Sequence, residues 1–201
     1  LFSYPMPDIP VKKNQIFISV VSCSGKDAEH DLKETESNYI ENMSKILKAY
    51  LKEGYYLVLS SFCREEGDEE EIRKIIAGMH CQDSTKVQIL NYNGTNLTQV
   101  LYTLVESEYI IGSRFHAVVL AMAAGRPVLP VIYSDKTKNM LDDLGFTGIV
   151  FDLRRNETWD YEQSRKNLDS SPFILSERIR RNSQEHFKKL DEFLEYGEKG
   201  K

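Results

Sequence analysis

The sequence predicts an α/β domain built as a doubly wound, Rossmann-like parallel sheet, and two observations carry this prediction. Short runs of β-branched or aromatic residues recur along the 201-residue chain. A longer stretch with apolar residues at helical spacing follows each of these runs. Strands that alternate with helices in this way imply right-handed βαβ crossovers. The strands should therefore lie parallel, with helices covering both faces of the sheet.

The strands are expected where the apolar runs are short and bounded by turn residues. They cover 16–22, 55–61, 86–90, 108–111 and 128–132. The helices expected between them often begin behind a Ser, Asp or Asn cap. They cover 35–53, 69–79, 96–106, 114–124 and 136–144. Gly54, Gly125 and Gly145 follow three of these helices, at the position where glycine commonly ends a helix.

The domain organisation follows from changes in pattern along the chain. We expect a linker over 1–15, the Rossmann-like domain over 16–155 and a C-terminal extension over 156–201. The first part is rich in proline and lacks periodicity, so it should be extended. Helical spacing of apolar residues over 176–196 predicts an amphipathic helix that packs on the domain. Because the chain begins at Leu1 without an initiator Met, we expect it to be a fragment that lacks an N-terminal portion.

Composition excludes several classes of protein. Hydrophobic residues make up 41% of the chain and charged residues 28%, and no apolar run is long enough for a membrane span. The net charge of -5 argues against nucleic-acid binding, which needs clustered Lys and Arg. The three cysteines form no CxxC pair, and no signal peptide is recognisable at the start. These observations favour a cytoplasmic protein.

Several common site motifs are absent from the sequence. It has no GxGxxG or GxxxxGK[ST] glycine loop and no GxSxG elbow, which argues against ordinary dinucleotide, P-loop and serine-hydrolase chemistry. The four histidines are scattered, so neither a metal nor another cofactor is expected. The acidic run 65–71, which contains Asp68, is interpreted as a solvated helix start, where carboxylates favour the helix dipole.

The candidate site comes from the turns that follow the strands, because open parallel sheets bind ligands at the carboxyl ends of their strands. These turns are 24–26, 63–64, 91–94, 112–116 and 133–138. The fourth turn is distinctive because 117–124 contains no polar side chain, which indicates a helix buried nearly all round. Arg114 and His116 stand at its start. Free backbone amides over 113–116 and a guanidinium together predict an anion pocket.

Other interpretations of these residues are open. Arg114 can instead pair with a neighbouring acid, and His116 can be a buried histidine with satisfied hydrogen bonds. Lys136 and Lys138 open the next helix, but residues two apart do not share a helical face, so at least one should extend into solvent. The cations Lys26 and Arg64 are interpreted as surface charges.

The polysaccharide pyruvyl transferase family has a signature that this chain closely resembles over 110–117 (IIGSRFHA) and 124–128 (AGRPV). The resemblance continues through 133–138 and 144–145. It implies a GT-B-type architecture of two facing Rossmann-like domains, of which this chain is the C-terminal, donor-binding one. The implied donor is phosphoenolpyruvate. Two hydroxyls of a saccharide acceptor, which can be lipid-linked, add to its C2 to form a ketal with loss of phosphate.

The same resemblance implies roles for individual residues. His116 is the catalytic acid, and the substrate-binding residues are Ser113, Arg114, Lys136 and Lys138. Arg114 and Lys136 would hold the carboxylate and the phosphate of the donor, and no metal or cofactor is required. Relatives carry an Arg shortly after the first strand, where this chain has Ser24-Gly25-Lys26, so its donor contacts should differ there.

Two other functions remain open at the level of sequence. A GT-B-type glycosyltransferase would bind a nucleotide sugar in the same cleft, with Arg114 or Lys138 on the diphosphate. A non-catalytic module would keep the fold and recognise a glycan or a partner protein. Binding of UDP instead of phosphoenolpyruvate would favour the first, and full function without His116 would favour the second.

Overall fold

The computed structural model contains one six-stranded sheet in which every neighbouring pair is parallel. It describes residues 8–23, 32–80, 84–155, 157–170, 177–185 and 188. The strand order β3-β2-β1-β4-β5-β6 is that of a doubly wound Rossmann-like sheet, so the predicted fold class is confirmed. The strands are β1 (Lys12–Val20), β2 (Tyr56–Ser61), β3 (Val87–Ile89), β4 (Ser107–Gly112), β5 (Val128–Ile132) and β6 (Phe151–Asp152).

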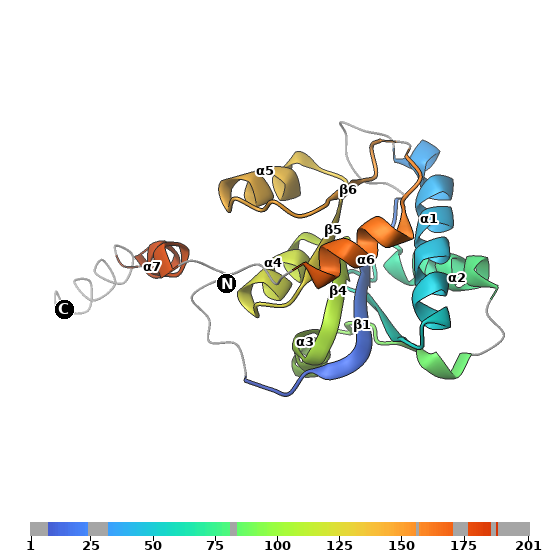
Figure 1. Cartoon of the computed structure of the whole chain (residues 1–201), viewed down its shortest axis with the longest axis horizontal. Coiled ribbons are helices and arrows are strands. Elements are labelled where there is room, and N and C mark those ends of the chain that lie inside the picture. Colours follow the sequence, from blue (N-terminus) through green and yellow to red (C-terminus); the bar gives the residue numbers. More distant parts are fainter. Residues whose placement is uncertain are drawn as a thin grey trace.

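Helices cover both faces of this sheet (Figure 1). They are α1 (Lys33–Lys52), α2 (Asp68–Met79), α3 (Leu97–Glu106), α4 (Phe115–Ala123), α5 (Asp135–Asp143), α6 (Tyr161–Asp169) and α7 (Glu177–Glu185), with the 3-10 turn η1 (Ser84–Lys86) before β3. Successive residues of β1 point to opposite faces. Ile16 and Ile18 pack in a core with α1, α2 and α6, whereas Phe17 packs in a second core with α3, α4 and α5.

The first strand begins at Lys12 rather than at residue 16, so the end of the predicted linker belongs to the sheet. Nζ of Lys12 lies 2.7 Å from Oε1 of Glu106, the last residue of α3. Nζ of Lys13 lies 3.1 Å from Oε1 of Glu108 in β4. A register shift follows these lysines, and Asn14 has a φ of 60°. Such a bulge leaves no apolar alternation for a sequence pattern to detect.

The predicted C-terminal extension begins inside the packed domain. The Trp159 ring stacks on Phe151 with 4.7 Å between ring centroids, and the hydroxyls of Tyr50 and Ser164 lie 3.0 Å apart. Leu168 of α6 is 1% exposed. Neither α6 nor β6 was expected, because α6 is rich in polar residues and β6 has only two residues. Both belong to the core of the domain.

Helix α7 agrees with the predicted C-terminal helix over the residues described there. Figure 1 shows it to one side of the sheet and of the helices that cover the sheet. Its packing on the domain stays a prediction. No helix within the described ranges combines the length and the apolar character needed to cross a membrane.

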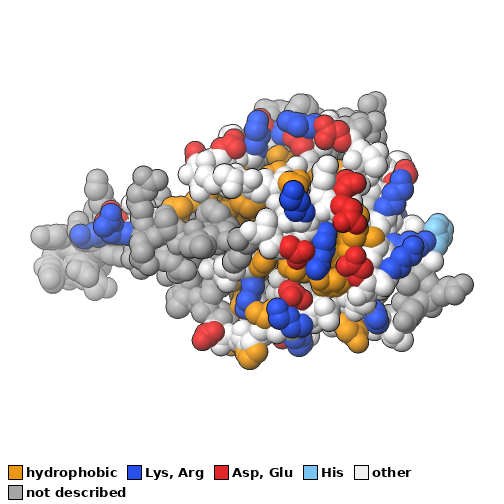
Figure 2. Space-filling model, in the orientation of Figure 1, with side chains coloured by type: hydrophobic (Ala, Val, Ile, Leu, Met, Phe, Trp, Pro, Cys, Tyr) orange, Lys and Arg blue, Asp and Glu red, His pale blue; other side chains and the backbone are white. Residues whose placement is uncertain are grey.

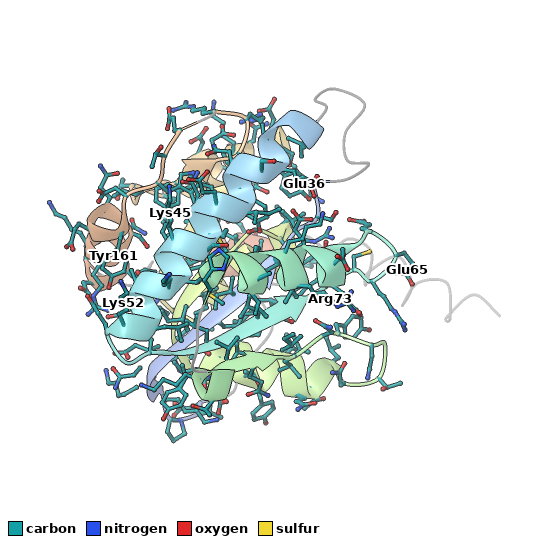
Figure 3. The ribbon with its side chains drawn as sticks, turned by 90° about the vertical axis from the view of Figure 1, so that its right-hand side faces the viewer. Glu36, Lys45, Lys52, Glu65, Arg73 and Tyr161 are labelled. Atoms are coloured by element: carbon teal, nitrogen blue, oxygen red, sulfur yellow. The ribbon has the colours of Figure 1, made fainter. Side chains whose placement is uncertain are left out.

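The surfaces differ in character from the two cores. Figure 3 shows α1 and α2 side by side over one face of the sheet, with Glu36 and Lys45 on α1 and Arg73 on α2. Basic and acidic side chains are interspersed on the face shown in Figure 2. Among the residues described on that face, no broad basic surface is seen.

Candidate functional site

The turns after β1 and β4 meet at the carboxyl edge of the sheet because these strands are neighbours. Ser19 of β1 lies opposite Gly112 of β4. The Ser113 amide donates to the Ser19 carbonyl at 3.0 Å and to its hydroxyl at 3.1 Å, and the Arg114 amide donates to the same hydroxyl at 3.2 Å. Two of the amides predicted to be free for an anion are therefore bonded within the protein.

The next three amides of this turn form the N-terminus of α4. Arg114 is the N-cap residue and its side chain makes no cap hydrogen bond. The first helical bond runs from the Val118 amide to the Arg114 carbonyl at 3.2 Å. The amides of residues 115–117 precede this bond, so helix geometry gives them no intrahelical acceptor. These amides and the positive end of the helix dipole keep the potential to bind an anion.

Close packing fixes the position of α4 against β4. A Cβ atom on Gly112 would lie 2.8 Å from Cγ2 of Val118, closer than real Cβ contacts allow. Glycine therefore lets the helix approach the end of the strand. Every α4 residue from Ala117 onward is buried except the half-buried Leu120, which agrees with the predicted apolar helix.

The guanidinium of Arg114 is bound by two acids from the start of α2. Nε donates to Oδ2 of Asp68 at 2.9 Å, Nη2 donates to Oδ1 of Asp68, and Nη1 donates to Oε2 of Glu66 at 2.6 Å. Asp68 is fully buried and also accepts the amides of Ser22, at 2.9 Å, and Cys63, at 3.2 Å. The interpretation of Arg114 as the partner of a neighbouring acid is confirmed.

Two acids of the run 65–71 are buried, so the interpretation of that run as solvated is wrong for them. Asp68 is 0% exposed and Glu71 is 1% exposed. Oε1 of Glu71 has no hydrogen-bond partner within the described part of the chain, and Oε2 lies 3.4 Å from Nζ of Lys74. Burial raises the pKa of Glu71 to about 7, although Lys74 opposes this shift. Local sequence carries no signal that separates these two acids from their exposed neighbours.

The side chains of His116 and Lys136 both lie beside Phe115, a residue for which the sequence predicted no role. The ring centroids of His116 and Phe115 lie 5.6 Å apart, and Nζ of Lys136 lies 4.4 Å from the centroid of the Phe115 ring. His116 and Lys136 are both exposed, so the interpretation of His116 as a buried histidine is wrong. Phe115 thus joins the starts of α4 and α5. An aromatic residue at the first helical position was the only sequence signal for it.

The remaining candidates lie in different surroundings. The Ser113 hydroxyl is buried and lies 3.1 Å from the Tyr39 hydroxyl, whose pKa is raised by burial. Lys138 is exposed and lines a pocket whose lining includes neither Phe115 nor Lys136. Lys136 is exposed too, in agreement with the prediction that at least one of the two lysines extends into solvent. Arg64 is 77% exposed, as expected of a surface charge. Residues 24–26 lie outside the described residues, so their predicted role stays a prediction.

The site offers cations and amides to an anionic ligand. Within the described ranges, no group of three or more His, Cys, Asp or Glu side chains is placed to hold a metal ion. The exposed side chains of His116 and Lys136 each lie beside Phe115, the first residue of α4. Such a set suits a small ligand with carboxylate or phosphate groups.

The fold is that of a Rossmann-like α/β domain, and helix N-termini and cationic side chains lie at the carboxyl ends of its strands. The chain belongs to the polysaccharide pyruvyl transferase family, whose model matches residues 5–135. A solved structure of a mutant O-GlcNAc transferase from Thermobaculum terrenum matches 93% of this chain at 16% identity, with a TM-score of 0.49. The chain spans 38% of the length of that transferase. A search of the curated proteins found no match.

Proposed function

We propose that this chain binds phosphoenolpyruvate at the starts of α4 and α5 and serves the transfer of its pyruvyl group to a saccharide. Membership of the pyruvyl transferase family supports the class of reaction. The observation that carries the assignment of the site is the convergence of His116 and Lys136 on Phe115, next to the N-terminus of α4. Phosphoenolpyruvate carries the two anionic groups that such a site would bind.

The donor would be held by charge from both helices. The phosphate accepts hydrogen bonds from the amides of residues 115–117 and from the ammonium of Lys136. The carboxylate takes the outer edge of the Arg114 guanidinium, where it replaces Glu66, whose side chain is 42% exposed. Asp68 keeps the guanidinium in place during this exchange, since its two hydrogen bonds to Arg114 are buried.

His116 would act as the proton donor of the reaction. One acceptor hydroxyl adds to C2 of the enolpyruvyl group while the imidazolium delivers a proton to C3, which becomes a methyl group, and the proton of that hydroxyl passes to the imidazole. A second hydroxyl then replaces the phosphate at C2 and closes the ketal, and its proton leaves with the phosphate. General acid catalysis of this kind contributes roughly 10² to 10⁴-fold to a rate.

The whole enzyme would extend beyond this chain. We infer that the chain is the C-terminal, donor-binding half of a two-domain, GT-B-type transferase, and that a further domain binds most of the acceptor. The acceptor would be a sugar of a cell-surface polysaccharide, either free or lipid-linked. The reaction would take place in the cytoplasm during exopolysaccharide biosynthesis.

Calorimetric titration of phosphoenolpyruvate into the 201-residue chain tests the proposed donor. Lys136→Ala should weaken binding about tenfold, because it removes a charge-assisted hydrogen bond. Lys138→Ala is the matched control, since Lys138 carries the same charge two residues further along α5 and faces a different pocket. Its affinity should match that of the parent chain.

Other outcomes of the titration would overturn this function. Binding of UDP without binding of phosphoenolpyruvate would support a glycosyltransferase. No measurable binding of either ligand would support a module without catalytic activity that binds a glycan or a partner protein. Equal weakening by the Lys136→Ala and Lys138→Ala substitutions would contradict the position given to the donor.

A further inference from the structure

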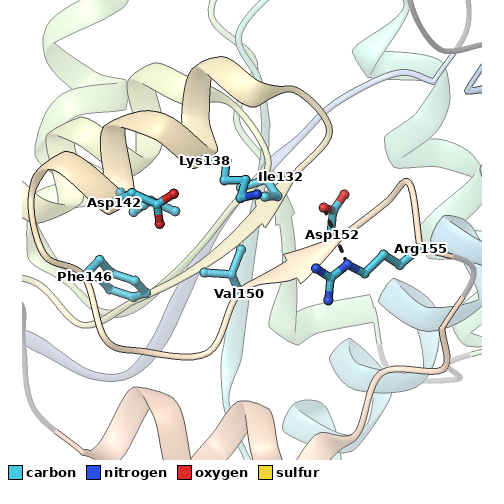
Figure 4. Close-up of a pocket in the computed structure, with 8 residues that line it drawn as sticks. Ile132, Lys138, Asp142, Phe146, Val150, Asp152 and Arg155 are labelled. Atoms are coloured by element: carbon cyan, nitrogen blue, oxygen red, sulfur yellow. Dashed lines mark ion pairs between the residues drawn. The ribbon is translucent and has the colours of Figure 1, made fainter.

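A pocket lies along α5, the helix whose first turn also carries Lys136 of the proposed donor site. It has a volume of about 180 Å³ and lies between α5 and the ends of β5 and β6 (Figure 4). The lining residues are Ile132, Lys138, Leu141, Asp142, Phe146, Val150, Asp152 and Arg155. Ligand pockets for drug-sized molecules usually measure roughly 300–1,000 Å³, so this one suits a single small ring.

The walls of the pocket combine apolar surface with charges of both signs. Figure 4 shows Lys138 and Asp142 on the α5 side, and Phe146 and Val150 facing them from the segment before β6. Phe146 and Val150 are half-buried, whereas Lys138 and Asp142 are exposed. One wall therefore offers apolar contact and the other offers both a donor and an acceptor of hydrogen bonds.

The end of the pocket is fixed to the start of α5 by an arginine. Nη1 of Arg154 lies 2.6 Å from a carboxylate oxygen of Asp135, and Nη2 lies 2.8 Å from one of Asp152. Despite its burial, Asp152 has a lowered pKa because Arg154 donates hydrogen bonds to it. Its negative charge therefore persists across the neutral range. Because Asp135 precedes Lys136, this bridge ties the pocket to the helix that carries the donor-binding lysine.

These features favour a sugar ring over a nucleotide or a second phosphate. A pyranose presents C–H groups on its faces, which can pack against Phe146, and hydroxyls that both donate and accept. Asp142 can accept from those hydroxyls and Lys138 can donate to them. A diphosphate at the same place would meet the carboxylates of Asp142 and Asp152 as well as the cations Lys138 and Arg155, so the lining offers it no net positive charge.

We propose that this pocket binds a sugar ring of the saccharide that accepts the pyruvyl group. This inference rests on the proposed function, because the ring is identified by its place beside the donor. Lys138 thereby contacts the acceptor and not the donor. Phe146 and Asp142 determine which sugar is accepted.

Chemical-shift mapping on the ¹⁵N-labelled 201-residue chain tests this assignment. The probes are the methyl β-glycosides of glucose, galactose and mannose, titrated into the tens-of-millimolar range. At least one of them should shift the amides around Asp142 and Phe146 in a saturable manner. Phe146→Ala and Asp142→Asn should each weaken that binding about fivefold or more. Asp143→Asn should leave it unchanged, because Asp143 is also exposed on α5 but does not line the pocket.

Phosphoenolpyruvate is titrated into a parallel sample, so that a failure of the proposed donor site can be distinguished from a failure of the proposed sugar pocket. Saturable sugar shifts at the pocket without any response to phosphoenolpyruvate would uphold the pocket and reject the proposed donor. A response to phosphoenolpyruvate at α4 with none to any of the three glycosides would overturn the pocket alone. Shifts around Phe146 caused by phosphoenolpyruvate would overturn it as well, since the pocket would then belong to the donor. An equal loss in the Asp143→Asn variant would reject the assigned contacts.

Discussion

At the scale of single residues, the guanidinium of Arg114 is shared between two carboxylates of different burial. Asp68 has no exposed side-chain surface, whereas the side chain of Glu66 is 42% exposed. Displacing a buried partner leaves an uncompensated charge in the interior and is therefore costly. An exposed ion pair contributes only about 0–1 kcal/mol. If phosphoenolpyruvate binds as proposed, its carboxylate should replace Glu66 rather than Asp68.

Glu66→Gln should therefore tighten the binding of phosphoenolpyruvate, by roughly three- to tenfold. The substitution removes a competitor for Nη1 of Arg114 and a negative charge that would repel the donor. Calorimetric titration of both proteins at the same ionic strength measures the change. Glu70→Gln is the matched control, because Glu70 is an exposed acid in the first turn of α2 that pairs with Arg73 at 2.8 Å. If both variants gain affinity equally, general charge and not Glu66 is responsible.

At the scale of elements, Asp68 connects four segments of the carboxyl edge. Asp68 is the first residue of α2. Its carboxylate accepts hydrogen bonds from the amides of Ser22, after β1, and Cys63, after β2, and from the guanidinium of Arg114, the N-cap residue of α4. Arg126 provides a similar link further along, since its Nε donates to the Val105 carbonyl at the end of α3 at 2.6 Å. Polar side chains thus hold the turns that the two apolar cores leave unpacked.

A double-mutant cycle on Asp68 and Arg114 measures the strength of this connection. Asp68→Leu alone should lower the free energy of unfolding by about 3–5 kcal/mol, because it leaves the Arg114 charge buried without its main partner. The Asp68→Leu, Arg114→Met double variant should lose much less than the sum of the two single variants. Urea denaturation followed by the fluorescence of Trp159, the single tryptophan, provides the values. Strictly additive losses would show that the two residues do not act as a pair.

At the scale of the whole molecule, the alternation of strands and helices determined what could be predicted. Each predicted strand and each helix of the main pattern is found within about three residues at its ends, apart from the earlier start of β1, as is typical of such predictions. These elements bury apolar residues on both faces of the sheet, which is what hydrophobic periodicity records. β6 and α6 were not predicted. β6 has only two residues, and its Phe151 stacks on Trp159. α6 is mostly polar and is held by contacts such as that between the hydroxyls of Tyr50 and Ser164.

The candidate site was less predictable because it depends on contacts between distant segments. The sequence predicted that His116 and Lys136 follow two successive strands, at the edge where parallel sheets bind ligands. That these strands, β4 and β5, are neighbours comes from the structure. The pairing of Arg114 with Asp68 could not be predicted, because the two lie 46 residues apart and Asp68 sits in an acidic run in which most of the other acids are at least partly exposed. The same holds for Phe115, whose contact with Lys136 depends on how α4 and α5 lie against each other.

Amide shift mapping with phosphoenolpyruvate tests whether the donor binds where α4 and α5 begin. Saturable addition of the ligand to the ¹⁵N-labelled chain should shift the amides of Phe115, His116 and Ala117 more than any others. A helix N-terminus that binds a phosphate changes the environment of those first amides. Saturable shifts confined to other turns, with these three unchanged, would contradict the account.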